Sequence, residues 1–151
     1  MKKVGSDSET FNSELQSNSK SAKLLQAILA IVGCGLLVAA VAVFLPVETM
    51  AQMHRWLGLG EFPDAPITRY LARSTSMLYA VHGALMLYVS FDVKRYWPLV
   101  AVFGWLHVVI GLAMLGIDMT SPMPLYWIAG EGVPIAAVGA LIVYLWRKST
   151  V

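Results

Sequence analysis

Long stretches without charged side chains constrain this chain more than any other feature. Four such stretches occur: 24 residues between Lys23 and Glu48, 18 between Arg73 and Asp92, 22 between Arg95 and Asp118, and 28 between Asp118 and Arg147, the last interrupted only by Glu131. An α-helix rises about 1.5 Å per residue, so roughly 20 apolar residues cross the hydrocarbon core of a bilayer. Each stretch can therefore hold one membrane-spanning helix, and none can hold two.

The expected fold is all-α, an integral membrane four-helix antiparallel bundle. Its domain covers residues 24–146, with spans at residues 24–45, 70–91, 97–117 and 124–146. Charged residues make up 13% of the 151 residues and hydrophobic residues 58%, whereas a soluble domain carries about 25% charged residues. A soluble helical bundle would need polar faces at helical spacing, and residues 38–45 have none.

The first 23 residues have the opposite character. Six of them are serines, mixed with Lys, Glu and Asn, and few are apolar. Such a segment cannot bury enough apolar surface to offset the entropy lost on ordering, so residues 1–23 are expected to form a disordered tail. The polar segment and the apolar run behind it are both too long for a cleaved signal peptide, so the first span is expected to remain as an anchor.

The distribution of basic residues predicts the orientation of the spans. Eight fall on the side of the two termini and of the turn between the second and third spans, namely Lys2, Lys3, Lys20, Lys23, Lys94, Arg95, Arg147 and Lys148. Three fall on the opposite side, namely Arg55, Arg69 and Arg73. Because cytoplasmic segments are enriched in basic residues, the tail 1–23 and the C-terminal residues 147–151 are expected in the cytoplasm and the loop 46–69 outside.

The outer loop contains an amphipathic segment at residues 47–58. Val47, Met50, Met53 and Leu57 recur there at helical spacing. Two interpretations follow: a short helix that lies in the membrane interface, or a loop that its apolar side chains hold near the lipid.

Charge and cysteine content exclude two kinds of interaction. The net charge is +2 and no run of Lys and Arg occurs, so we expect no nucleic-acid partner. Cys34 is the only cysteine, so the chain has no internal disulfide and no cysteine-ligated metal site. The partner that the composition predicts is the lipid bilayer.

The order of several short motifs resembles the DoxX-like four-helix membrane proteins over about residues 24–146. The motifs are Leu45-Pro46, Trp56-Leu57-Gly58-Leu59, Tyr70-Leu71-Ala72-Arg73-Ser74 with Gly83 deeper in the second span, and the basic turn Asp92-Val93-Lys94-Arg95, followed by a last span that a proline opens. The resemblance implies a compact antiparallel bundle in the bacterial inner membrane. It also implies membrane-complex subunits, in some members beside redox enzymes, or further copies of the chain as partners. It carries no active site to numbered positions here.

Ionisable residues at membrane depth are the first candidates for function. His82 lies about 12 residues before the turn near residue 94 and His107 about 13 after it, so both are expected at one depth. Three interpretations remain open for this site, to which Tyr79 also belongs. The histidines join the helices by hydrogen bonds, they ligate a haem b with Gly83, Gly104 and Gly111 leaving room for the ring, or they line a proton or ligand pathway.

A second candidate site lies at the outer face. Glu131 is framed by Gly130, Gly132 and Pro134, a pattern typical of a broken helix. It is expected near the depth of Arg73 and Arg69, which share a helix face at a spacing of four residues. Glu131 either pairs with Arg73, or handles protons, while Arg69, Arg73 and His54 could bind an anion or a lipid head group.

These sites predict a small membrane protein without catalysis of its own, a bundle or an accessory subunit. No catalytic residue, metal or cofactor is expected. The alternatives are an electron carrier with haem b between His82 and His107, and a carrier of small anions that uses Arg69, Arg73 and Glu131.

Overall fold

The computed structural model describes residues 4–121 and 123–149, with side chains from Ser19 onward. Seven helices follow one another: α1 (Val4–Leu37), α2 (Ala40–Phe44), α3 (Val47–Trp56), α4 (Pro66–Ser90), α5 (Trp97–Thr120), α6 (Leu125–Gly130) and α7 (Gly132–Lys148). Within the described ranges no residue belongs to a strand. The predicted all-α class is confirmed.

Three segments are long and apolar enough to cross a membrane: Ser19–Phe44, Trp97–Thr120 and Leu125–Lys148. They correspond to the first, third and fourth expected spans. The second expected span, residues 70–91, overlaps α4, which is not among these three segments, so a fourth span stays a prediction. Its polar side chains, among them Arg69 and Arg73, make α4 less apolar than the other three segments.

The first helix starts earlier than the sequence predicts. Ser21, Leu25 and Leu29 are spaced by four residues and are all buried, because this face of α1 packs against the other helices. Residues 19–23 are therefore helical, and the predicted tail boundary at residue 23 is wrong for them. The disorder predicted for the residues before Ser19 stays a prediction.

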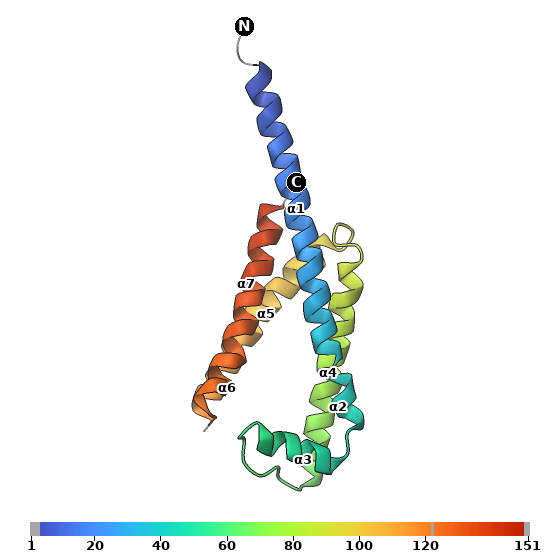
Figure 1. The fold of residues 1–151 in the computed structure, drawn as a ribbon, viewed down its shortest axis with the longest axis vertical. Coiled ribbons are helices and arrows are strands. Elements are labelled where there is room, and N and C mark those ends of the chain that lie inside the picture. Colours follow the sequence, from blue (N-terminus) through green and yellow to red (C-terminus); the bar gives the residue numbers. More distant parts are fainter. Residues whose placement is uncertain (1–3, 122, 150–151) are drawn as a thin grey trace.

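The helices form two antiparallel pairs (Figure 1). α1 packs along α4, and α5 packs along α7. We call the end of the molecule with the turn at residues 91–96 the hairpin end and the opposite end the α3 end. The pairs meet at the hairpin end, where α1 contacts α7, and they diverge toward the α3 end.

The main apolar core lies toward the hairpin end. Nine buried side chains from all four long helices and from the turn form it, namely Leu25, Leu29, Met86, Val89, Val93, Val100, Phe103, Ile142 and Leu145. Two tryptophans extend it: the indole of Trp146 donates a hydrogen bond to the Trp97 carbonyl at 3.2 Å, and the two rings stack at 6.2 Å. This end of the molecule is a closed, interdigitated four-helix contact.

Glycines allow the helices within each pair to approach closely. A Cβ on Gly83 of α4 would lie 2.6 Å from the carbonyl oxygen of Gly33 on α1. A Cβ on Gly111 of α5 would lie 2.4 Å from the backbone nitrogen of Ala136 on α7. Such small-residue contacts are how helices associate in lipid, where burial of apolar surface gives no advantage.

Two helices are broken, one as the sequence predicts. α6 ends at Gly130 and α7 begins at Gly132, so the break falls at Glu131. Pro134 has no backbone N–H to donate to the carbonyl of Gly130, four residues before it. The first span also breaks, at residues 38–39, which the sequence does not predict. There the amides of Val41 and Ala42 bond to carbonyls three residues back, a tighter turn than the α-helix makes.

The amphipathic segment of the outer loop is helical. α3 covers Val47–Trp56, two residues less than the predicted 47–58, and buries Met50. The chain leaves it through Gly58 and Gly60, whose φ angles are +69° and +87°. These are values that side-chain-bearing residues rarely adopt, which is why glycine ends this helix.

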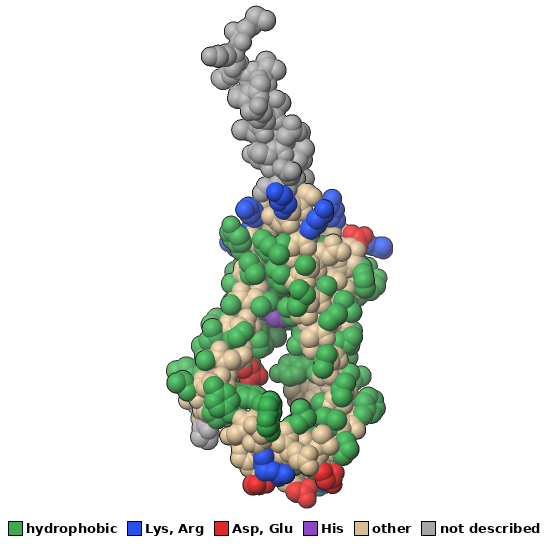
Figure 2. Space-filling model, viewed as in Figure 1, with side chains coloured by type: hydrophobic (Ala, Val, Ile, Leu, Met, Phe, Trp, Pro, Cys, Tyr) green, Lys and Arg blue, Asp and Glu red, His purple; other side chains and the backbone are tan. Residues whose placement is uncertain are grey.

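Charged side chains gather at the two ends of the molecule. On the face drawn in Figure 2, Lys and Arg cluster at the hairpin end, acidic and basic side chains lie at the α3 end, and hydrophobic side chains cover the surface between. Many of these side chains are strongly exposed, such as Ile31 at 72% and Phe44 at 85%. An apolar exposed band between charged ends is the surface of a protein that contacts lipid.

Candidate functional site

A cavity of about 380 Å³ lies between the two helix pairs. Its walls come from α1, α4, α5 and α7, and its lining residues are Val32, Leu36, Leu78, Tyr79, His82, His107, Ile110, Pro134, Ile135 and Val138. Figure 2 shows the molecule hollowed at this level, with histidine and acidic side chains at the rim. The structure thus brings together Tyr79, His82 and His107, as the first candidate site requires.

The two histidines face each other without a hydrogen bond between them. Their ring centroids are 5.2 Å apart and the rings are tilted by 39°. The Nδ1 of His107 bonds to the carbonyl of Phe103 in its own helix at 2.8 Å. The Nε2 of His82 is buried and has no partner among the described residues. The two histidines therefore do not hydrogen-bond each other, and their role in joining the helices stays a prediction.

The glycines near the histidines are in close contact with neighbouring helices. Gly83 meets α1 at Gly33, and Gly104 meets Val143 of α7, where a Cβ would lie 2.7 Å from a methyl carbon. Gly111 meets Ala136 of the same helix. The room that the haem alternative expects beside these glycines is therefore filled by neighbouring helices, and the open space lies on the side of Tyr79 and Pro134 instead.

Glu131 is hydrogen-bonded within its own part of the chain. Its Oε2 accepts a hydrogen bond from the indole nitrogen of Trp127 at 2.6 Å. Glu131 is the residue between the end of α6 and the start of α7. It is not among the residues that line the cavity, whereas Pro134 in the first turn of α7 is.

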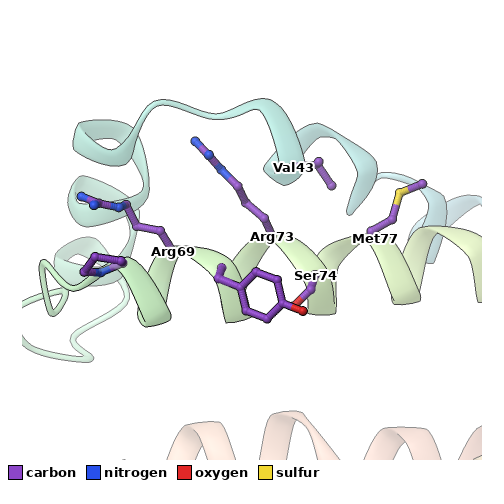
Figure 3. A pocket seen from close by; sticks show the side chains of 7 residues that line it. Val43, Arg69, Arg73, Ser74 and Met77 are labelled. Carbon is purple, nitrogen blue, oxygen red and sulfur yellow. The ribbon is translucent and has the colours of Figure 1, made fainter.

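Arg73 and Arg69 lie on the other side of α4. Figure 3 shows both side chains extending from one face of α4 toward the segment that joins α2 and α3. Arg73 donates from Nη2 to the carbonyl of Leu45 at 3.2 Å, and Arg69 pairs with Asp64 at 2.7 Å. The predicted pair of Arg73 with Glu131 is therefore not formed, because α4 directs the arginine away from α6 and α7.

The two arginines line a second depression, of about 510 Å³. Its other lining residues are Val43, Pro66, Tyr70, Ser74 and Met77 (Figure 3). His54 is not among them. Its Nδ1 bonds to the carbonyl of Gly60 at 3.0 Å and its ring lies edge-on to Phe62, so the structure separates His54 from the outer-face site to which the sequence assigns it.

Asp118 is a buried acidic residue that neither candidate site includes. Its side chain is 3% exposed, and Oδ2 has no hydrogen-bond partner in the described part of the chain. Its place near the end of an apolar stretch indicates an exposed boundary residue, but the structure buries it. Pro134 is also absent from both predicted sites. The sequence identifies it as a helix breaker, and the structure shows that it also lines the cavity.

Comparison with known proteins adds no relative. No family model matches the chain, and the searches of curated proteins and of solved structures give no match.

Proposed function

We propose that this chain is a four-span membrane protein without catalysis of its own, and that the cavity between its helix pairs holds a small lipophilic molecule with a hydrogen-bonding group. The DoxX-like layout and a role as an accessory subunit of a membrane complex, which the sequence suggests, are part of this proposal. Orientation with both termini in the cytoplasm of a bacterium belongs to it as well.

In this proposal, α4 is the span that completes the set of four, and it is the second along the chain. It packs antiparallel along α1, and its 25 residues would extend about 37 Å, enough to cross a bilayer. Its polar side chains do not need to face lipid. Tyr79 and His82 line the cavity, and Arg69 and Arg73 lie in its first two turns, from which arginine reaches the interface.

The observation that carries the proposal is the unpartnered Nε2 of His82 beside an apolar cavity. Ligand sites are mostly apolar cavities of roughly 300–1,000 Å³ with a few convergent polar groups. This cavity has that volume and that composition: three polar side chains stand among seven apolar ones. A buried polar atom without a partner is destabilising, so a ligand hydroxyl or carbonyl that bonds to His82 would stabilise the occupied state.

The proposal is tested with 2-naphthol and naphthalene, which share a ring system and differ by one hydroxyl. Their affinities are measured from the ligand dependence of the unfolding midpoint of the detergent-purified chain. A single net hydrogen bond of about 1 kcal/mol predicts about fivefold tighter binding of 2-naphthol. His82→Phe, which keeps the volume and removes the nitrogens, is expected to abolish the preference.

His54→Phe is the matched control, because His54 lies outside the cavity and should leave the preference unchanged. Equal binding of the two compounds by the wild type, or an unchanged preference in His82→Phe, contradicts the proposal. If the wild type has a Soret band in its absorption spectrum, and both His82→Ala and His107→Ala lose it, the proposal is wrong and the chain is an electron carrier with haem b.

Orientation is tested by labelling intact cells with an impermeant thiol reagent. Cysteines are placed at Ser19 and Asp64 in a Cys34→Ala background. Label is expected at position 64 and not at position 19, because the loop between α3 and α4, which contains Asp64, lies at the α3 end, and the first half of α1, which contains Ser19, lies toward the hairpin end. Equal labelling of the two positions contradicts the four-span arrangement.

A further inference from the structure

We propose that the depression beside Arg73 binds the phosphate of an anionic lipid from the leaflet at the α3 end. The proposal depends on α4 crossing the bilayer, and it does not depend on any ligand in the cavity at His82. It assigns a ligand class to the arginines that the sequence places in a site with His54 and Glu131.

The guanidinium of Arg73 keeps most of its hydrogen-bonding capacity. It carries five N–H donors, and one bond, to the Leu45 carbonyl, is described for it. Among the described residues no carboxylate lies within ion-pair distance of Arg73, whereas Arg55 and Arg69 pair with Glu61 and Asp64. Arg73 is therefore a cation whose position is fixed by the protein and whose charge has no counter-ion within it.

The surroundings of Arg73 favour an anion. Arg69 lies four residues earlier on the same face of α4, and like charges at this spacing repel each other. α4 begins at Pro66, which also lines the depression, so the positive end of the helix dipole points to the same place. A phosphate near the arginines would relieve their repulsion and accept hydrogen bonds from the Arg73 guanidinium.

Depth and lining indicate a lipid rather than a soluble anion. In Figure 3 the Arg73 side chain runs back toward the start of α4, which brings its guanidinium to the level of the head groups. Val43 and Met77 continue the depression along the helix toward the bilayer interior. A phosphate at Arg73 would therefore place an acyl chain along apolar side chains.

The experiment compares lipids of opposite head-group character on the full-length chain. Phosphatidylglycerol and phosphatidylcholine with identical acyl chains are titrated into the detergent-purified protein, and bound lipid is counted by native mass spectrometry. The wild type is expected to bind phosphatidylglycerol about tenfold more tightly, because the choline cation is repelled by the same arginines. Arg73→Gln is expected to reduce the preference to less than about twofold.

Arg55→Gln is the control, because it removes an equal charge from α3 outside the depression and should leave the preference unchanged. Asp64→Asn provides a gain of binding: Asp64 is a strongly exposed residue, and its replacement releases Arg69 from the ion pair and should raise the affinity for phosphatidylglycerol. This variant keeps the test decisive if Arg73→Gln does not fold.

The proposal is overturned by equal affinity for the two lipids in the wild type, by an unchanged preference in Arg73→Gln, or by no gain in Asp64→Asn. If inorganic phosphate alone shifts the unfolding midpoint as much as phosphatidylglycerol, the site belongs to a soluble anion and the lipid assignment is overturned. A loss of naphthol selectivity in His82→Phe has no bearing on this result, so the two proposals fail separately.

Discussion

The hairpin end and the α3 end are built from the same helices and differ in how the two pairs meet. At the hairpin end the pairs share one core, with Met86, Val100 and Ile142 fully buried. At the α3 end each pair stays intact, but the space between the pairs contains the cavity and the separate outer segment with α3. Close packing therefore holds one end together, and the other end keeps polar side chains accessible.

The difference has a physical origin in what holds helices together in lipid. Apolar faces gain little by leaving lipid, so contact is maintained by close packing and hydrogen bonds. Gly33 with Gly83 and Gly111 with Ala136 supply close packing inside each pair. The close glycine contacts described for the four long helices lie inside a pair. Between the pairs, the hairpin end has the shared apolar core, and at the α3 end a hydrogen bond from the Tyr126 hydroxyl to the Leu57 carbonyl joins the outer segment to α6.

The largest effect is expected from Gly111→Ala, which tests the contact within a pair. The new Cβ would lie 2.4 Å from a backbone nitrogen that cannot move aside alone, so α5 and α7 must separate. We expect a loss of about 3 kcal/mol in the free energy of unfolding, measured in mixed micelles. Gly116→Ala is the control because nothing lies near its Cβ; a similar loss there would show that helix contact is not the cause.

A smaller effect is expected from Ile142→Ala, which tests the shared core of the hairpin end. Ile142 is fully buried, so its truncation leaves a cavity and should reduce the free energy of unfolding by about 2 kcal/mol. The matched change at the α3 end is Leu125→Ala, since Leu125 is 80% exposed and should change stability by less than about 0.5 kcal/mol. Equal losses would remove the distinction between the two ends.

The smallest effect is expected from Tyr126→Phe, which tests the bridge at the α3 end. Loss of one hydrogen bond at an exposed site should lower stability by about 1 kcal/mol or less. The change should instead appear as faster amide hydrogen exchange in residues 57–65, since the loop loses its contact with α6. Tyr144→Phe is the control, because Tyr144 is exposed on α7 and no hydrogen bond is described for it; faster exchange in both variants would contradict the bridge.

Much of the candidate site could be predicted from the sequence, because equal distance from a turn places residues at equal depth. His82 and His107 meet for this reason, and a helix break is expected at Glu131 because Pro134 has no amide to bond to the carbonyl of Gly130, four residues before it. The partners of these side chains could not be predicted. Two residues at the same depth can still point to different sides of their helices. In the structure Arg73 points toward Leu45 rather than toward Glu131.

The sequence by itself determines that the chain is helical and contains membrane-spanning segments. Backbone N–H and C=O groups in lipid must form their hydrogen bonds within the protein. The long charge-free stretches of this chain are therefore expected to be helical. Only the tertiary structure decides which faces meet. Gly83 and Gly111 support helix contacts rather than ligand space, and Asp118 is buried, because both outcomes depend on side chains that packing brings from distant parts of the chain.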